Sequence, residues 1–200
     1  MSRPGAARRV ARAVAGVVLL AGSYAEAKRG ELPPYEERLF RMANHAPDAW
    51  AIPVRAVMQA GTFGTVPAIA TVAFLAGRRR LAATLLVGGT LAWFGAKAIK
   101  PYGGRARPAG VLEDVITRER IEGDLGWVSG HSAVATTTAF ILADHDLPGW
   151  ARPVLVLVVA VTAFGRMYVG AHLPHDTVGG AGLGMVISAA MPSTREPADD

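Results

Sequence analysis

Residues 56–77, AVMQAGTFGTVPAIATVAFLAG, run for 22 positions without Asp, Glu, Lys or Arg. About 20 mostly apolar residues in a helix are enough to cross the roughly 30 Å hydrocarbon core of a bilayer. We therefore predict that this stretch crosses a membrane as one helix. It indicates that the chain is a membrane protein.

The composition of the whole chain leads to the same class. Its 200 residues are 51% hydrophobic and 18% charged, whereas soluble domains carry about 25% charged residues. The absence of cysteine excludes disulfides, zinc–thiolate sites, iron–sulfur clusters and cysteine nucleophiles. The net charge of +5 lies in short basic clusters rather than one stripe, so nucleic acid is not an expected partner.

Further uncharged stretches complete the predicted bundle. Together with residues 56–77 they give an all-α polytopic membrane helix bundle of about six transmembrane helices. These stretches are residues 13–25, 81–96, 125–143, 153–165 and 177–194. Residues 28–55 mix charged and apolar side chains, which is typical of an interfacial segment rather than a span.

Arginine clusters predict the orientation of this bundle. With six spans, three clusters fall on one side: Arg8, Arg9 and Arg12, then residues 78–80, then Arg152. An excess of basic residues marks the cytoplasmic side. The outer face then holds three segments: residues 26–60, 97–130 and 166–176.

Polar clusters occur at the ends of the predicted helices on that outer face, where charge invites a functional explanation. They are Lys100, Arg105 and Arg107–Pro108; residues 129–132 (SGHS); and Arg166, His172, His175 and Asp176. Arginine and lysine neutralise phosphate oxygens, and a hydroxyl with backbone N–H groups at a helix N-terminus binds anions. Two histidines permit nucleophilic attack and protonation of a leaving group. The set suits a phosphate ester.

The order and spacing of these residues resemble the three-part signature of the type 2 phosphatidic acid phosphatase family. The matching positions are Lys100-x6-Arg107-Pro108, Ser129-Gly130-His131 and Arg166-x5-His172-x3-Asp176. The resemblance covers residues 60–190. Two positions depart from it: Val128 replaces a proline, which affects loop stiffness, and Gly165 replaces a serine, which removes a possible hydroxyl contact to phosphate.

This resemblance implies a six-helix membrane phosphatase whose active site faces outward from the cytoplasmic membrane. It implies that His172 is the nucleophile that forms a phosphohistidine, that Asp176 orients it, and that His131 is the general acid. It implies a phosphate cradle formed by Lys100, Arg107, Ser129, Gly130 and Arg166. No metal and no cofactor are implied. The histidine and carboxylate pairing is chemically consistent, because a carboxylate on one ring N–H leaves the other nitrogen neutral for attack.

The division of the chain follows from the same resemblance. Residues 1–60 are expected to form an N-terminal transmembrane helix and interfacial segment, residues 61–192 the phosphatase core, and residues 193–200 a disordered tail. The first helix also fits a signal peptide cleaved after residues 25–27 (AEA), but the six-helix family pattern favours its retention.

The expected activity is hydrolysis of a lipid phosphomonoester or diphosphate, such as polyprenyl diphosphate, phosphatidate, phosphatidylglycerol phosphate or a prenyl-linked sugar phosphate. Expected partners are this substrate and membrane lipids, and the oligomeric state stays open. One alternative is a lipid phosphotransferase with the same covalent intermediate and an alcohol acceptor. Another is a non-catalytic binder or transporter of anionic lipids, which leaves the histidines unused. A metal site at the histidines and Asp176 is disfavoured, because three neighbouring cations repel a divalent ion.

Several of these residues also have simpler structural interpretations. Ser129 and Asp176 can cap helices. Arg105 could be a second phosphate ligand, but contact with lipid headgroups is the preferred expectation. His175 is a competitor of His172, although the family spacing selects His172. The acidic residues of 113–124 could recognise a polar headgroup, but we expect them to balance nearby arginines. Gly180 and Gly184 are expected to pack within the bundle rather than in a dimer.

Overall fold

The structure, a computed structural model, describes residues 3–145 and 147–192. Within these residues the regular secondary structure is helical, apart from one isolated β-bridge between Ala106 and Leu125, which confirms the predicted class. The α-helices are α1 (Arg3–Lys28), α2 (Pro34–Asn44), α3 (Ala51–Met58), α4 (Thr65–Leu75), α5 (Arg79–Gly103), α6 (Gly130–Ala143), α7 (Ala151–Tyr168) and α8 (Pro174–Ala190). The 3₁₀ turns are η1 (Asp48–Trp50), η2 (Gln59–Gly61) and η3 (Pro108–Gly110).

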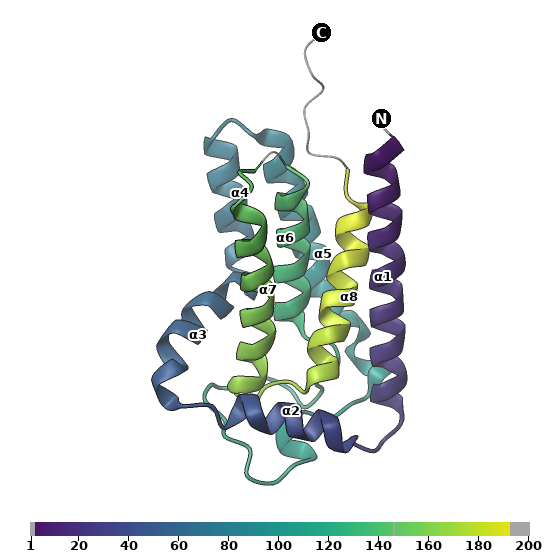
Figure 1. The fold of residues 1–200 in the computed structure, drawn as a ribbon, viewed down its shortest axis with the longest axis vertical. Helices are drawn as coiled ribbons and strands as arrows, with labels where there is room; N and C mark the ends of the chain where they lie inside the picture. The colour runs from purple at the N-terminus through teal and green to yellow at the C-terminus, as the bar shows by residue number, and fades with distance from the viewer. Residues whose placement is uncertain (1–2, 146, 193–200) are drawn as a thin grey trace.

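The long helices lie side by side, and α2 lies across one end of them (Figure 1). Helix α6 is central and packs against α5, α7 and α8, while α1 packs along α8. The loops after α5 and after α7 reach the same end as α2, at the bottom of the view (Figure 1). The start of α1 and the turn between α4 and α5 lie at the other end (Figure 1). The bundle therefore has one end at which α2 and both loops meet.

Three of the described helices are long and apolar enough to cross a membrane: α1 from Gly5, α5 and α7. The α3–η2 segment and α4 together form a fourth candidate, a bent pair. Helices α6 and α8 have 14 and 17 residues and run beside these spans. The chain is thus a polytopic membrane helix bundle, and the count of six spans stays a prediction.

The prediction of one continuous helix across residues 56–77 is wrong. The segment from Asp48 to Gly61 and helix α4 meet at an angle of 68°. At the break, Gly61 lies so close to α6 that a Cβ there would be 2.6 Å from the carbonyl oxygen of His131. The hydroxyl of Thr62 donates to the carbonyl of Gln59 at 2.8 Å and offers the backbone a turn instead of a helix. The break therefore brings this span against the start of α6.

Glycines allow α8 to pack closely between α1 and α6. A Cβ on Gly182 would lie 2.7 Å from the backbone nitrogen of Leu20 in α1, and a Cβ on Gly184 would lie 2.6 Å from the carbonyl oxygen of Ala133 in α6. Gly180 meets the carbonyl of Ser129 in the same way. The expectation that Gly180 and Gly184 pack within the bundle is confirmed.

The first helix is also tied to the far end of the bundle by an ion pair. Arg12 donates two hydrogen bonds to the carboxylate of Asp144, at 2.9 and 2.7 Å, and its guanidinium lies 4.4 Å from the ring centre of Phe140. Retention of this helix in the mature protein stays a prediction. The predicted disordered tail, residues 193–200, lies outside the described residues.

Candidate active site

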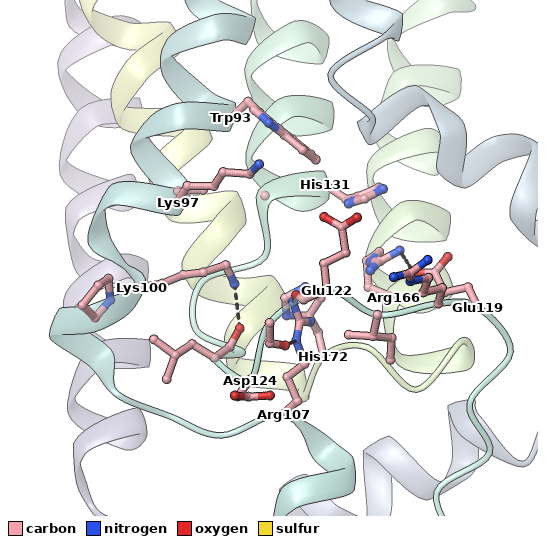
Figure 2. Close-up of a pocket in the computed structure, with 17 residues that line it drawn as sticks. Trp93, Lys97, Lys100, Arg107, Glu119, Glu122, Asp124, His131, Arg166 and His172 are labelled. Carbon is pink, nitrogen blue, oxygen red and sulfur yellow. Dashed lines mark hydrogen bonds and ion pairs between the residues drawn. The ribbon is translucent and has the colours of Figure 1, made fainter.

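The end of the bundle that carries α2 also gathers the predicted site residues. Six of the eight line one cavity of about 590 Å³: Lys100, Arg107, Gly130, His131, Arg166 and His172. Figure 2 shows His131 on α6 and His172 on the loop before α8, with cations on both sides of the cavity. The side chains of Ser129 and Asp176 are buried behind its wall. Residues as far apart in the sequence as Lys100 and His172 thus meet at one place.

Two of the predicted residues cap the helices that carry the histidines. The hydroxyl of Ser129 accepts a hydrogen bond from the backbone N–H of Ser132 at 3.3 Å and begins α6. Asp176 accepts a hydrogen bond through Oδ2 from the backbone N–H of Leu173 at 2.9 Å in the first turn of α8. The capping interpretation therefore holds for both. Because the side chain of Ser129 is used as a cap, Gly130 lines the cavity and Ser129 does not.

His172 is backed by Asp176 on the side away from the cavity. Its Nδ1 lies 3.4 Å from Oδ2 of Asp176, without hydrogen-bond alignment, and Nδ1 has no other partner among the described residues. Burial, together with the positive charges of Lys100 and Arg166, holds the pKa of His172 well below its usual value of 6.5. The imidazole is therefore neutral, which is the form that a nucleophile requires.

Two cations of the predicted cradle also hold the loop that closes the cavity. The ammonium of Lys100 donates to the carbonyls of Leu125, Gly126 and Val128 at 3.1, 2.8 and 2.9 Å. Arg107 donates to the carbonyls of Gly123, Ala171 and Glu122 at 2.6, 2.8 and 2.8 Å. These bonds fix the loop between α5 and α6 against the loop before α8.

The third cation, Arg166, is paired with an acidic residue of the same loop. Its Nη1 donates to Oε1 of Glu119 at 2.5 Å, and both residues line the cavity (Figure 2). The Nε of Arg166 is buried and has no hydrogen-bond partner among the described residues. The expectation that acidic residues of 113–124 balance arginines agrees with this pair.

The structure corrects the expectation for Arg105. This arginine is 9% exposed and does not face lipid. Its guanidinium forms two hydrogen bonds with Glu36 of α2 and lies 3.5 Å from Asp176. Burial alone raises the pKa of Glu36, but hydrogen bonds from Arg105 and from the backbone of His175 outweigh it and hold this pKa below its usual value.

Some cavity residues lie outside the sequence motifs. Trp93 and Lys97 line it from α5, with the Lys97 ammonium 5.0 Å from the Trp93 ring centre and the Trp93 ring edge-on to His131 at 5.8 Å. Glu122 extends into the space near His131 (Figure 2). A sequence signal for the two α5 residues existed, because positions 93, 97 and 100 share one face of a helix.

Gly165, which replaces the serine of the third motif, faces α3 rather than the cavity. A Cβ there would lie 3.1 Å from both Sδ of Met58 and Cγ1 of Val54. A serine at this position would crowd the α3–α7 contact. The glycine is therefore explained by packing.

His175 has its own partner and does not line the cavity. Its Nδ1 lies 3.0 Å from Oε2 of Glu36, and its Nε2 lies 3.4 Å from the hydroxyl of Tyr35. Its position agrees with the choice of His172 over His175.

No three His, Asp or Glu side chains of residues 3–145 and 147–192 come together in a metal-binding arrangement.

Comparisons with known proteins extend these observations. The sequence model of the PAP2 superfamily matches residues 80–198. The fold is similar to the crystal structure of Aquifex aeolicus LpxE, with a TM-score of 0.68, 24% identity, and coverage of 76% of this chain and 90% of that chain. It is also similar to a transmembrane PAP2 type phosphatidylglycerolphosphate phosphatase from Bacillus subtilis, with a TM-score of 0.71, 18% identity, and coverage of 88% and 92%. No curated protein sequence matches the chain.

Proposed function

This chain belongs to the PAP2 superfamily, and we propose that it is a membrane phosphatase that hydrolyses a lipid phosphomonoester or diphosphate through a phosphohistidine at His172, without a metal ion. One observation carries the proposal. A neutral, buried histidine with a carboxylate behind it faces a cavity that also holds His131, Arg107 and Arg166. This arrangement supplies a nucleophile, an acid and charge stabilisation in one place.

The first step forms the covalent intermediate. The Nε2 of His172 attacks phosphorus while its Nδ1–H faces Asp176, so that an N–P bond forms as the bond to the lipid oxygen breaks. The negative charge of the bound phosphate favours protonation of His131, which then gives this proton to the departing oxygen. Arg107 and Arg166 stabilise the charge spread over the three equatorial oxygens.

The second step restores the enzyme. A water molecule gives one proton to the now neutral His131 and attacks phosphorus from the side that the lipid alcohol has left. The N–P bond breaks, inorganic phosphate leaves, and His172 is neutral again. The same two side chains therefore serve both halves of the reaction, with His131 acting first as an acid and then as a base.

A lipid substrate fits the position of the cavity. The site lies at the ends of helices that are apolar enough to cross a membrane, so a phosphate head can enter while the lipid tail stays in the bilayer. The arginines of residues 78–80 lie at the opposite end (Figure 1), which supports an outer-face site in the cytoplasmic membrane. The name of the Bacillus subtilis protein refers to phosphatidylglycerolphosphate, so this lipid joins polyprenyl diphosphate and phosphatidate as a first candidate.

The proposal is tested by phosphate release from purified protein in detergent, with EDTA present, across a panel of lipid monophosphates and diphosphates. We expect release by the wild type and by His45→Ala, an exposed histidine outside the cavity, and none by His172→Ala. A variant His172→Ala with full turnover contradicts the nucleophile assignment, and loss of wild-type activity with EDTA contradicts metal independence. Transfer of phosphate to an added lipid alcohol, without release to water, favours the phosphotransferase alternative.

A further inference from the structure

Three charged side chains are buried together behind His172, outside the cavity. Glu36 and Asp176 are fully buried, and Arg105 is 9% exposed. They come from α2, from the loop after α5 and from α8, and none of them lines the cavity. Burying charges is unfavourable unless each one has partners with good geometry, so the cluster needs an explanation beyond substrate binding.

Glu36 fixes the guanidinium of Arg105 in both direction and distance. The Nη1 of Arg105 donates to Oε1 of Glu36 at 2.9 Å, and its Nη2 donates to Oε2 at 2.5 Å. This two-point contact matches the planar fork of arginine to a carboxylate. Oε1 also accepts a hydrogen bond from the backbone N–H of His175 at 2.9 Å. Glu36 thus attaches α2 and Arg105 to the first turn of α8.

Asp176 lies between that guanidinium and the nucleophile. Its Oδ1 is 3.5 Å from Nη1 of Arg105, and its Oδ2 is 3.4 Å from Nδ1 of His172. Oδ2 also accepts the backbone N–H of Leu173. A guanidinium beside one oxygen stabilises the ionised carboxylate, and that carboxylate selects the Nδ1–H tautomer of the neighbouring imidazole.

We propose that Glu36 and Arg105 are positioning residues for the Asp176–His172 pair. Glu36 holds Arg105 in place, and Arg105 favours the ionised form of Asp176 and holds its carboxylate beside Nδ1 of His172. Neither residue touches the substrate. The proposal rests on the proposed function only in taking His172 as the nucleophile.

This pairing makes α2 part of the catalytic apparatus. One side of α2 buries Glu36 and Phe40, while Tyr35, Leu39 and Met42 are exposed on the rest of its surface. The helix lies across the end of the bundle (Figure 1). Its register against α8 therefore determines where Arg105 sits, and through Arg105 the orientation of Asp176.

The charges around Asp176 determine the direction of the expected pH effect. Burial raises the pKa of Asp176 to about 6. Arg105 and Lys100 attract its negative charge and oppose this rise, whereas Glu36 repels that charge and adds to it. His172 is its remaining neighbour in the site, and His175 with Tyr35 completes the surroundings of Glu36. Removing the charge of Arg105 favours the protonated form of Asp176, so the acid limb of the kcat profile moves to higher pH.

The kinetic test compares Arg105→Gln and Glu36→Gln with the wild type on the best lipid phosphate of the panel. We expect kcat to fall about 10- to 100-fold in both variants, the range typical for loss of the outer partner of a metal-bound histidine, with KM nearly unchanged. The acid limb should move to higher pH in Arg105→Gln only, because Glu36→Gln removes a negative charge that repels Asp176. In an Asp176→Asn background, Arg105→Gln has no further effect on kcat, because the two act as one unit. The control is Glu37→Gln on the same helix, whose carboxylate pairs with Arg41 at 2.7 Å.

A second readout does not depend on turnover. Ring ¹⁵N NMR of the five histidines, with His172 assigned from His172→Ala, reports its tautomer directly. We expect the Nδ1–H tautomer in the wild type and in Glu37→Gln, and a mixture with the Nε2–H tautomer in Arg105→Gln. If Arg105→Gln does not fold, Glu36→Gln gives the same test with Arg105 present. Wild-type kcat, pH profile and tautomer in these variants overturn the proposal. If the tautomer changes as expected but the wild type releases no phosphate from any lipid, the positioning proposal stands and the proposed function is contradicted.

Discussion

The guanidinium of Arg166 donates a hydrogen bond to the carboxylate of Glu119 at 2.5 Å, and both residues line the cavity. The carboxylate thus holds the cation that a substrate phosphate would need. A phosphate and a carboxylate are both acceptors for the planar fork of arginine. We therefore expect Glu119 to compete with a substrate phosphate for Arg166 in the ground state.

Replacing Glu119 by glutamine is expected to lower KM about 3- to 10-fold, because the substrate no longer displaces a negative charge from Arg166; this corresponds to roughly 1 kcal/mol of binding. Steady-state kinetics on one lipid phosphate measures the change. Glu113→Gln, in the same loop but outside the cavity, is the matched control. A KM that rises in Glu119→Gln would mean that Glu119 orients Arg166 for the substrate instead.

Asp176→Asn is expected to lower kcat about 10²- to 10⁴-fold, as loss of the carboxylate behind a catalytic histidine does elsewhere. Asparagine keeps an oxygen for the backbone N–H of Leu173, and asparagine also caps helices well. The thermal unfolding midpoint should therefore stay close to that of the wild type although kcat falls. A large loss of stability with kcat unchanged in the folded fraction would reduce Asp176 to a helix cap.

The lowered pKa of His172 predicts a stability effect with a definite sign. Below the unfolded pKa of about 6.5, the unfolded chain binds a proton that the folded His172 excludes, so stability falls as the pH drops. Above that pH the effect is absent. His172→Gln should lose less stability than the wild type between about pH 7 and pH 5.

Thermal unfolding in detergent at a series of pH values measures this difference. His45→Gln, at an exposed position at the end of α2, is the control and should follow the wild type. Parallel curves for His172→Gln and the wild type would show that His172 titrates normally in the folded protein.

Gly165→Ser is expected to destabilise the fold without improving catalysis. The added side chain meets Met58 and Val54 at 3.1 Å, and overpacking of this kind costs about 1–3 kcal/mol, or very roughly 2–10 °C in the unfolding midpoint for a chain of this size. Gly95→Ser is the control, because a Cβ on Gly95 has no atom within 4 Å. A lower KM in Gly165→Ser would instead mean that the hydroxyl reaches the phosphate.

Much of the site could be predicted from the sequence because its residues lie at fixed spacings, next to recognisable apolar runs. Lys100, His131 and His172 are at the ends of apolar runs, and the alternation of spans brings those ends to one face. The capping positions of Ser129 and Asp176 follow from local chemistry. For these residues, local patterns are enough.

The parts that could not be predicted depend on contacts between distant segments. At the break, Gly61 of η2 lies against the carbonyl of His131, and no uncharged run reveals such a neighbour. From the sequence, Arg105 is expected to be an interfacial cation, because its partner Glu36 lies 69 positions earlier and only the fold brings the two together. An amphipathic pattern identifies the polar face of α2 but not the partner of each residue on it.

The central claim is that phosphate passes through a covalent bond to His172, and rapid acid-free quenching of the enzyme with a ³²P-labelled lipid phosphate tests it most directly. The account predicts that label remains on the wild-type protein as an acid-labile, base-stable adduct in the peptide that contains His172, and that His172→Ala carries none. Label on another residue would contradict the account, as would wild-type turnover with no labelled protein in single-turnover samples taken before product release is complete.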